Sequence, residues 1–156
     1  MRGKQARARK AKPDDIYGSE NISKFINYVM ERGKKTVAQK IVYSAIENLS
    51  KQVKLAPAEA FEKALENIKP KIELRTRRVG GANYQVPVPV SESRQLALSM
   101  RWIINAAKAG RGKEDGGKNL SRELINAFNK EGTAYKKREE VHKMAEANKA
   151  FSHLTW

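Results

Sequence analysis

The chain contains no cysteine, which excludes disulfide bonds, thiolate nucleophiles and zinc sites built on cysteine. Its two histidines, His142 and His153, are too far apart in sequence to bind one metal ion from a single helix turn. No Ser-His-Asp catalytic order can be assembled with either histidine. We therefore expect a protein that is not an enzyme, with no catalytic residues, no metal site and no cofactor.

Long apolar runs are missing as well. No run approaches the ~20 residues that span a bilayer, and no signal-peptide core follows the N-terminus. These absences predict a soluble, intracellular protein without a membrane partner.

Acidic residues are scarce relative to basic ones. The 156 residues include 32 Lys and Arg against 17 Asp and Glu, which gives a net charge of +15. Such an excess causes self-repulsion in the folded state, so a polyanionic partner is the natural explanation. Charge alone fits RNA, DNA or an anionic membrane surface equally well. The length is that of one domain with a sizeable core.

Apolar residues recur at helical spacing in six segments. The first begins near Asn21, with Ser19 or Asn21 as its N-cap, and ends at Gly33. The sequence therefore predicts a mainly α body of six helices. The other five segments are 37–49, 60–68, 96–107, 120–128 and 135–148, with Ser91 as the cap of the fourth and a mobile loop over 110–117.

A β-hairpin is predicted between the third and fourth helices, over residues 71–90. Apolar residues alternate with polar ones on both sides of Gly80-Gly81, as strands require. We expect an odd-numbered loop, 80–82, with a bulge, because it would place Leu74 on the same face as Val86. Pro87 and Pro89 should remove donors from the outer edge only and so prevent further strand pairing.

Basic residues mark this hairpin as a candidate nucleic-acid contact. Arg75, Arg77 and Arg78 follow one another with no acid between Glu73 and Glu92. Asn83 and Tyr84 lie on the returning strand, where they could add polar and stacking contacts. The alternative interpretation is an arm that is merely solvated.

Residues 1–12 form a basic N-terminal extension ahead of a single domain over 13–156. The extension has little to bury and should be disordered alone. It either solubilises the protein or becomes ordered on phosphate. Its basic residues are Arg2, Lys4, Arg7, Arg9, Lys10 and Lys12.

Three further basic groups lie on the helices. Lys34 and Lys35 sit at a helix junction that fails the Walker pattern, and they are better explained as backbone-phosphate contacts. The predicted last helix begins with three cations, which the helix dipole disfavours at that end, and the two acids that follow partly neutralise them. Trp102 is either half-buried or a base-stacking platform. The other members of these groups are Arg94, Arg101 and Lys108, which repeat every seven residues and share one helix face, and Lys136, Lys137 and Arg138.

Four motifs together resemble the family of small ribosomal subunit protein seven. The N-terminal motif reads PDDIYGSENISKFINYVMERGKKTVAQKIVYSAI, and the hairpin reads KPKIELRTRRVGGANYQVPVPV. The fourth helix reads SRQLALSMRWIINAA, and the end, of the bacterial type, reads KKREEVHKMAEANKAFSHLTW. The resemblance covers nearly the whole chain.

The resemblance implies a six-helix body with a β-ribbon inserted after the third helix. It also implies binding to the 3′ major domain of small-subunit rRNA, nucleation of head assembly, and a cytoplasmic location in the small ribosomal subunit. The exit-site tRNA, the mRNA path and neighbouring small-subunit proteins would lie nearby. The residues that would face RNA, carried over by position, are the tail cations, Lys34, Lys35, the three hairpin arginines, Arg94 and Arg101. An architectural DNA binder with a basic β-arm is the alternative.

Overall fold

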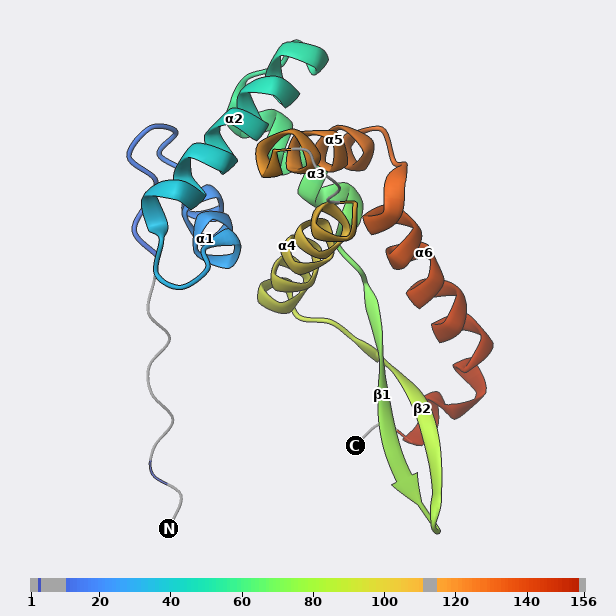
Figure 1. Ribbon diagram of the computed structural model, residues 1–156. Helices are drawn as coiled ribbons and strands as arrows, with labels where there is room; N and C mark the ends of the chain where they lie inside the picture. Colours follow the sequence, from blue (N-terminus) through green and yellow to red (C-terminus); the bar gives the residue numbers. More distant parts are fainter. Residues whose placement is uncertain (1–2, 4–10, 111–114, 155–156) are drawn as a thin grey trace.

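The computed structural model describes residues 3, 11–110 and 115–154 and confirms the mainly α prediction. A helical body carries one two-stranded hairpin, which projects from it (Figure 1). The elements in chain order are α1 (Glu20–Val29), α2 (Lys35–Val53), α3 (Pro57–Ile68), β1 (Ile72–Val79), β2 (Ala82–Pro89), α4 (Glu92–Ala109), α5 (Gly116–Phe128), α6 (Gly132–Ala147) and the short 3₁₀ helix η1 (Lys149–Leu154).

Two predictions concern segments that the description covers only in part. Of the basic extension, residues 1–2 and 4–10 lie outside the described residues, as do residues 111–114 of the predicted loop. The loop is shorter than predicted, because Gly116 and Gly117 already belong to α5. Gly117 is buried and lies close to Ser44 of α2.

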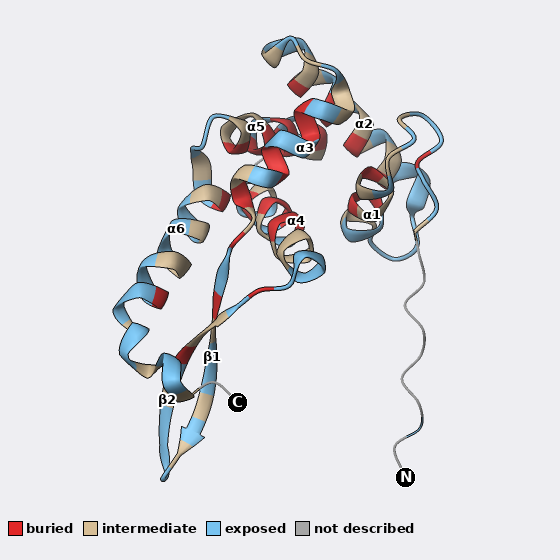
Figure 2. Cartoon of the chain, turned by 180° about the vertical axis from the view of Figure 1, so that it is seen from behind, coloured by how far each residue is buried: buried red, intermediate tan, exposed pale blue. Residues whose placement is uncertain are grey.

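The core lies among α1 to α5, on the faces that the apolar spacing predicts (Figure 2). Phe25 of α1 and Phe61 of α3 are both fully buried, with ring centroids 5.1 Å apart. Trp102 is half-buried against this core, which agrees with the first of its two interpretations. Burial of apolar surface on this scale is the main stabilising contribution to such a body.

The predicted end of the first helix at Gly33 is wrong. Helix α1 ends at Val29 with Met30 as its C-cap, because the backbone of Met30 is extended (φ −61°, ψ 130°).

The predicted N-cap residues are correct, with one difference. Ser19 is the N-cap of α1, and its hydroxyl accepts the backbone N–H of Ile22 at 3.4 Å. Ser91 is the N-cap of α4, but its side chain makes no capping hydrogen bond. Pro57 occupies the first turn of α3, where its missing N–H costs nothing.

The predicted register of the hairpin is wrong. Val79 pairs with Ala82, so the loop has two residues rather than three, and Leu74 lies opposite Pro87 rather than beside Val86. Gly80 and Gly81 both adopt positive φ, +57° and +89°. A two-residue turn of this kind matches the right-handed twist of the strands, and two glycines make it possible without steric cost.

The register decides which face of the hairpin is covered. Glu73 and Val86 are buried on one face, whereas Ile72 on the other is 38% exposed. The covered face packs against α6 and η1, and the ring of Tyr84 lies 5.2 Å from that of Phe151. Phe151 of the aromatic end therefore packs on the hairpin.

The two prolines of β2 lie as predicted on the outer edge. The backbone N–H of Val90 donates to Lys71 at 3.1 Å, so this position faces the partner strand. Pro87 and Pro89 lie three residues and one residue before Val90. Backbone N–H groups along a strand point alternately toward and away from the partner strand, so the nitrogens of both prolines point away from β1. The missing donors thus interrupt only the free edge, which protects it against pairing with another chain.

Helix α6 also holds the base of the hairpin. The Nε2 atom of His142 accepts the backbone N–H of Lys71 at 3.1 Å, and Arg138 donates to the carbonyl oxygen of Asn67 at 2.9 Å. Burial, helped by the charges of Arg138 and Lys71, lowers the pKa of His142 below its ordinary 6.5. The neutral imidazole is the form that can accept this hydrogen bond.

Acidification is expected to loosen the base of the hairpin. Because the pKa of His142 is lower in the folded chain, the contact contributes fully above pH 6.5 and is lost as the pH falls through the folded value. Amide exchange should show a lower protection factor at Lys71 at pH 5 than at pH 7.5. A His153→Ala variant should keep this dependence and His142→Ala should lose it. Equal protection of Lys71 at both pH values would contradict the assignment.

Candidate nucleic-acid interface

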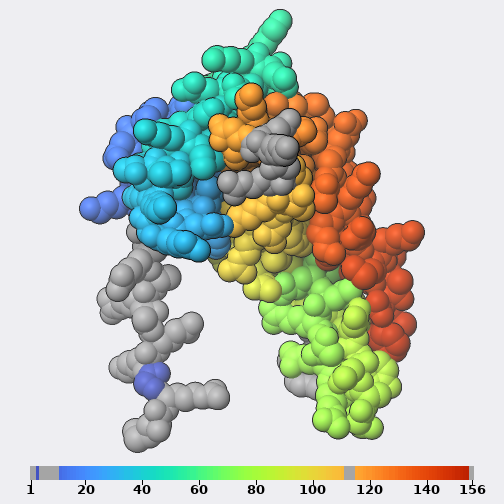
Figure 3. Space-filling view, in the orientation of Figure 1, coloured from blue at the N-terminus to red at the C-terminus, as the bar shows by residue number. Residues whose placement is uncertain are grey.

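The hairpin, called the arm below and made of β1 and β2, presents positive charge on both of its faces. Arg75 and Arg77 alternate with Thr76 and Arg78 along β1, so Arg78 points to the face opposite the other two. Arg75 and Arg78 are exposed and Arg77 is half-buried. In the space-filling view the arm projects beyond α4 and lies beside the end of α6 (Figure 3). We call these three residues the arm arginines. Arg75 and Arg77 lie on the covered face, where Arg75 is still exposed, and Arg78 is exposed on the open face.

The two polar residues predicted to assist them differ in exposure. Asn83 lies opposite Arg78 and is exposed. Tyr84 lies on the covered face and is half-buried against Phe151. One side of the Tyr84 ring is thus occupied within the protein, which reduces the area available for stacking on a base.

The basic stripe of α4 consists of Arg94, Arg101 and Lys108, and each of the three has a partner within the chain. Arg94 pairs with Glu73 of β1, the guanidinium of Arg101 lies 5.6 Å from the centroid of the Tyr28 ring, and Lys108 pairs with Glu31. The Arg94 and Lys108 side chains nevertheless remain 50% exposed. The α4 stripe therefore connects α4 to the arm and to the region of α1, while it still faces solvent.

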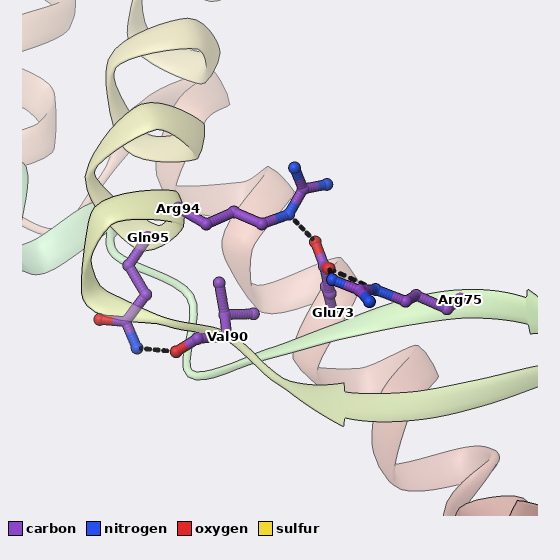
Figure 4. Close-up of polar contacts among 5 residues, drawn as sticks. All are labelled: Glu73, Arg75, Val90, Arg94 and Gln95. Atoms are coloured by element: carbon purple, nitrogen blue, oxygen red, sulfur yellow. Dashed lines mark hydrogen bonds and ion pairs between the residues drawn. The ribbon is translucent and has the colours of Figure 1, made fainter. Parts of the chain in front are cut away.

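Glu73 lies at the junction between the arm and α4 (Figure 4). Its Oε2 atom accepts from Nε of Arg94 at 2.6 Å, and its Oε1 atom accepts from Nε of Arg75 at 2.8 Å. Burial alone would raise the pKa of the Glu73 carboxyl, but the hydrogen bonds from the two arginines outweigh it and hold the pKa below its ordinary value. We call these three residues the Glu73 clamp.

The α1–α2 junction carries two more cations and brings one of them, Lys34, close to the α4 stripe. Lys34 and Lys35 open α2, are exposed, and have no acid in the first turn of that helix. Lys34 and Lys108 line the same hollow of about 230 Å³, together with Glu31. The structure thus joins two basic groups that are far apart in sequence.

The cations predicted to open the last helix lie in its second turn, because α6 begins at Gly132. Their environments differ. Lys136 and Lys137 are exposed, and Lys137 pairs with Glu140 at 3.3 Å. The Arg138 side chain is only 22% exposed, because it donates to Asn67 and lies 5.3 Å from the centroid of the Tyr135 ring. Arg138 therefore has an internal role that accounts for its position so early in the helix.

Of the basic extension, Lys12 is exposed, whereas Arg2, Lys4, Arg7, Arg9 and Lys10 lie outside the described residues. The chain is fixed to the body immediately after Lys12. Asp14 is buried, accepts the N–H groups of Ile16 and Tyr17, and accepts the Tyr43 hydroxyl of α2 at 2.7 Å. Burial, followed by the hydrogen bond to Asp14, raises the pKa of Tyr43 to about 12.

Over the described ranges, no group of three His, Cys, Asp or Glu residues could hold a metal ion. Within the same ranges, none of the helices has the length and apolar character needed to cross a membrane.

A family model for ribosomal proteins S7p/S5e matches residues 1–149. The chain belongs to this family. It is 54% identical to the small ribosomal subunit protein uS7 of Thermosipho melanesiensis over the full length of both chains. The uS7 protein of Rhodobacter capsulatus is 54% identical over 97% of this chain and 96% of its own, and that of Thermotoga petrophila is 50% identical over all of both.

Membership of the S7p/S5e family confirms the resemblance carried by the four sequence motifs. The chain is a structural ribosomal protein of the small subunit and not an enzyme. Binding of rRNA is the property that the family implies for it.

The sequence reasoning missed Glu73 and Asp14 as organising residues of this S7p/S5e protein. A signal was present for Glu73, which is the one acid of the arm and stands two residues from Arg75 on the same strand face. Its second partner, Arg94, is 21 residues away. Only the folded chain brings that residue into contact.

Proposed function

We propose that this chain binds the 3′ major domain of small-subunit rRNA and nucleates assembly of the head of the subunit. The observation that carries the proposal is the basic surface formed by the arm, the α4 stripe and the α1–α2 junction. These elements point in different directions from one body (Figure 1), which suits contact with several rRNA helices at once.

The proposed contacts are to shape and backbone rather than to base edges. The major groove of A-form RNA is too narrow to admit a helix, so a protein of this kind recognises junctions of several RNA helices. Exposed lysines and arginines neutralise phosphates and release counterions. The contact residues that we propose are Arg2, Lys4, Arg7, Arg9, Lys10, Lys12, Lys34, Lys35, Arg75, Arg77, Arg78, Asn83, Arg94, Arg101, Lys108, Lys136 and Lys137, with Tyr84 and Arg138 in reduced roles.

We further propose that the arm lies near the exit-site tRNA and the mRNA path, with a neighbouring small-subunit protein close by. The support is the length and charge of the arm, which projects from the helical body and ends in the turn between β1 and β2 (Figure 1). The prolines on the outer edge of β2 suit this location, because they keep that edge from recruiting another strand.

The test is equilibrium binding of the full chain to a transcript of the rRNA 3′ domain, with a transcript of the 5′ domain as the control. We expect at least a hundredfold preference for the 3′ domain. Reconstitution then tests the assembly role, because other head proteins should join the 3′ domain only after this chain is bound. Equal affinity for the two transcripts would contradict the proposal.

Removal of residues 1–12, the proposed extension of the domain over 13–156, should weaken rRNA binding without affecting folding. The deletion removes six cations but keeps Asp14 and its contacts to α2. We expect about tenfold weaker binding to the 3′-domain transcript and a Tm within about 1 °C of the full chain. Equal rRNA affinity of the two proteins would favour the solubilising interpretation of the tail.

A further inference from the structure

We infer that Glu73 is a positioning residue for RNA binding, which joins the arm to α4 so that the arm arginines and the α4 stripe form one rigid surface. The inference rests on the proposed function and concerns the same basic surface. Its starting point is the Glu73 clamp, in which the two carboxylate oxygens are divided between Arg75 of β1 and Arg94 of α4 (Figure 4).

An acid is an unfavourable choice at this position if packing is its only role. Glu73 is 8% exposed, shares the covered face with Val86, and is the one acid within the arm. It removes positive charge from a surface that meets a polyanion, and its burial costs hydration energy. A neutral side chain would avoid both costs. The position therefore calls for the property that only a carboxylate has, which is to bind two guanidinium groups simultaneously.

The geometry of the clamp leaves both arginines able to bind phosphate. Each guanidinium has five N–H donors. Arg94 gives its Nε donor to Glu73, and Arg75 approaches through Nε and one terminal nitrogen, both at 2.8 Å. The two arginine side chains remain 50% and 51% exposed. Glu73 thus holds one nitrogen of Arg94 and two of Arg75 in place while other donors stay accessible.

The base of the arm has a second connection to α4. The side-chain amide of Gln95 donates to the carbonyl oxygen of Val90 at 2.9 Å (Figure 4). This bond fixes the end of β2, whereas the clamp fixes β1. With both strands tied to α4, the direction of the arm is set before RNA binds, which reduces the conformational entropy lost on binding.

The variant Glu73→Gln distinguishes a positioning role from a simple effect of charge, because the two predict opposite changes in rRNA affinity. It adds one positive charge to the surface, so charge alone predicts tighter rRNA binding. Positioning predicts about fivefold weaker binding to the 3′-domain transcript. The matched control is Glu92→Gln, which makes the same charge change at an exposed site two residues from Arg94 and should bind as tightly as the unsubstituted chain or more tightly.

A second readout follows the direction of the arm itself. Because the chain has no cysteine, Ala82→Cys provides a single attachment site at the arm tip for a reagent that cleaves nearby RNA. Cleavage should be confined to a few nucleotides with Glu73 present and should spread over more of them with Glu73→Gln. Glu73→Asp, which keeps the charge but shortens the reach, should spread the cleavage in the same way.

Before binding is compared, far-UV circular dichroism is used to check that each variant is folded. Affinity of Glu73→Gln equal to that of Glu92→Gln, together with an unchanged cleavage pattern from the reagent at the arm tip, would overturn the positioning role alone. Failure of the unsubstituted chain to bind the transcript would instead overturn the proposed function, and the inference with it.

Discussion

Simultaneous replacement of Arg75, Arg77 and Arg78 by alanine is expected to lower the affinity for the rRNA 3′ domain by about a hundredfold near physiological salt. The three side chains carry positive charge on both faces of the arm, and at least two of them are exposed. Each lost phosphate contact should also reduce the log–log salt slope by roughly 0.7 to 0.9, so the variant should show a shallower slope by about 2.

The same variant should keep its fold. The arm projects from the body, and the arm arginines lie outside the buried core (Figures 2 and 3). The Tm should therefore change by no more than about 3 °C, with the loss of the Arg75–Glu73 pair as the main cause. A matched control replaces Lys40, Lys51 and Lys118, three exposed lysines of α2 and α5, by alanine. A drop in affinity equal to that of the arm variant would mean that only total charge matters.

The second large effect is on stability, and it concerns the core of the helical body. Phe61→Ala should reduce the free energy of unfolding by about 3–5 kcal/mol, because the Phe61 ring is fully buried and packs on Phe25. For a chain of this length the Tm should fall by roughly 10 °C. Thermal unfolding followed by circular dichroism measures this change.

Phe151→Ala is the matched control for the core variant. It makes the same chemical change, but Phe151 is only half-buried where η1 meets the arm at Tyr84. The free energy of unfolding should fall by about 1 kcal/mol. At temperatures where Phe61→Ala is still folded, the core variant should bind rRNA as tightly as the unsubstituted chain. Weak rRNA binding by folded Phe61→Ala would contradict the separation of core and interface.

The helices were predictable because their signals are local. Apolar residues at helical spacing locate α1 to α5, and Ser19 and Pro57 mark two helix starts in the structure. The hairpin was predictable for the same reason, since its strands alternate around a pair of glycines. The existence of the arm and the chain position of its arginines could thus be read from the sequence.

The register and the partners of the basic residues could not be predicted from the sequence. Gly80-Gly81 is compatible with a two-residue or a three-residue loop, and the choice moves Val86 from the face of Leu74 to the face of Glu73. The covering of that face by α6 and η1 depends on residues about 70 positions away. The seven-residue spacing of its cations predicts that the α4 stripe lies on one helix face, but it does not predict which residues of other elements contact them.

The measurement that tests the central claim most directly is binding of the full chain to the rRNA 3′-domain transcript across a salt series, with bent duplex DNA as the competitor. The account predicts tight binding with a steep salt dependence that excess DNA does not abolish, because several rRNA helices are contacted by a surface of fixed shape. Competition by bent DNA at equal concentration would contradict it. In that case the arm, with its prolines and arginines, would be better explained as that of an architectural DNA-binding protein.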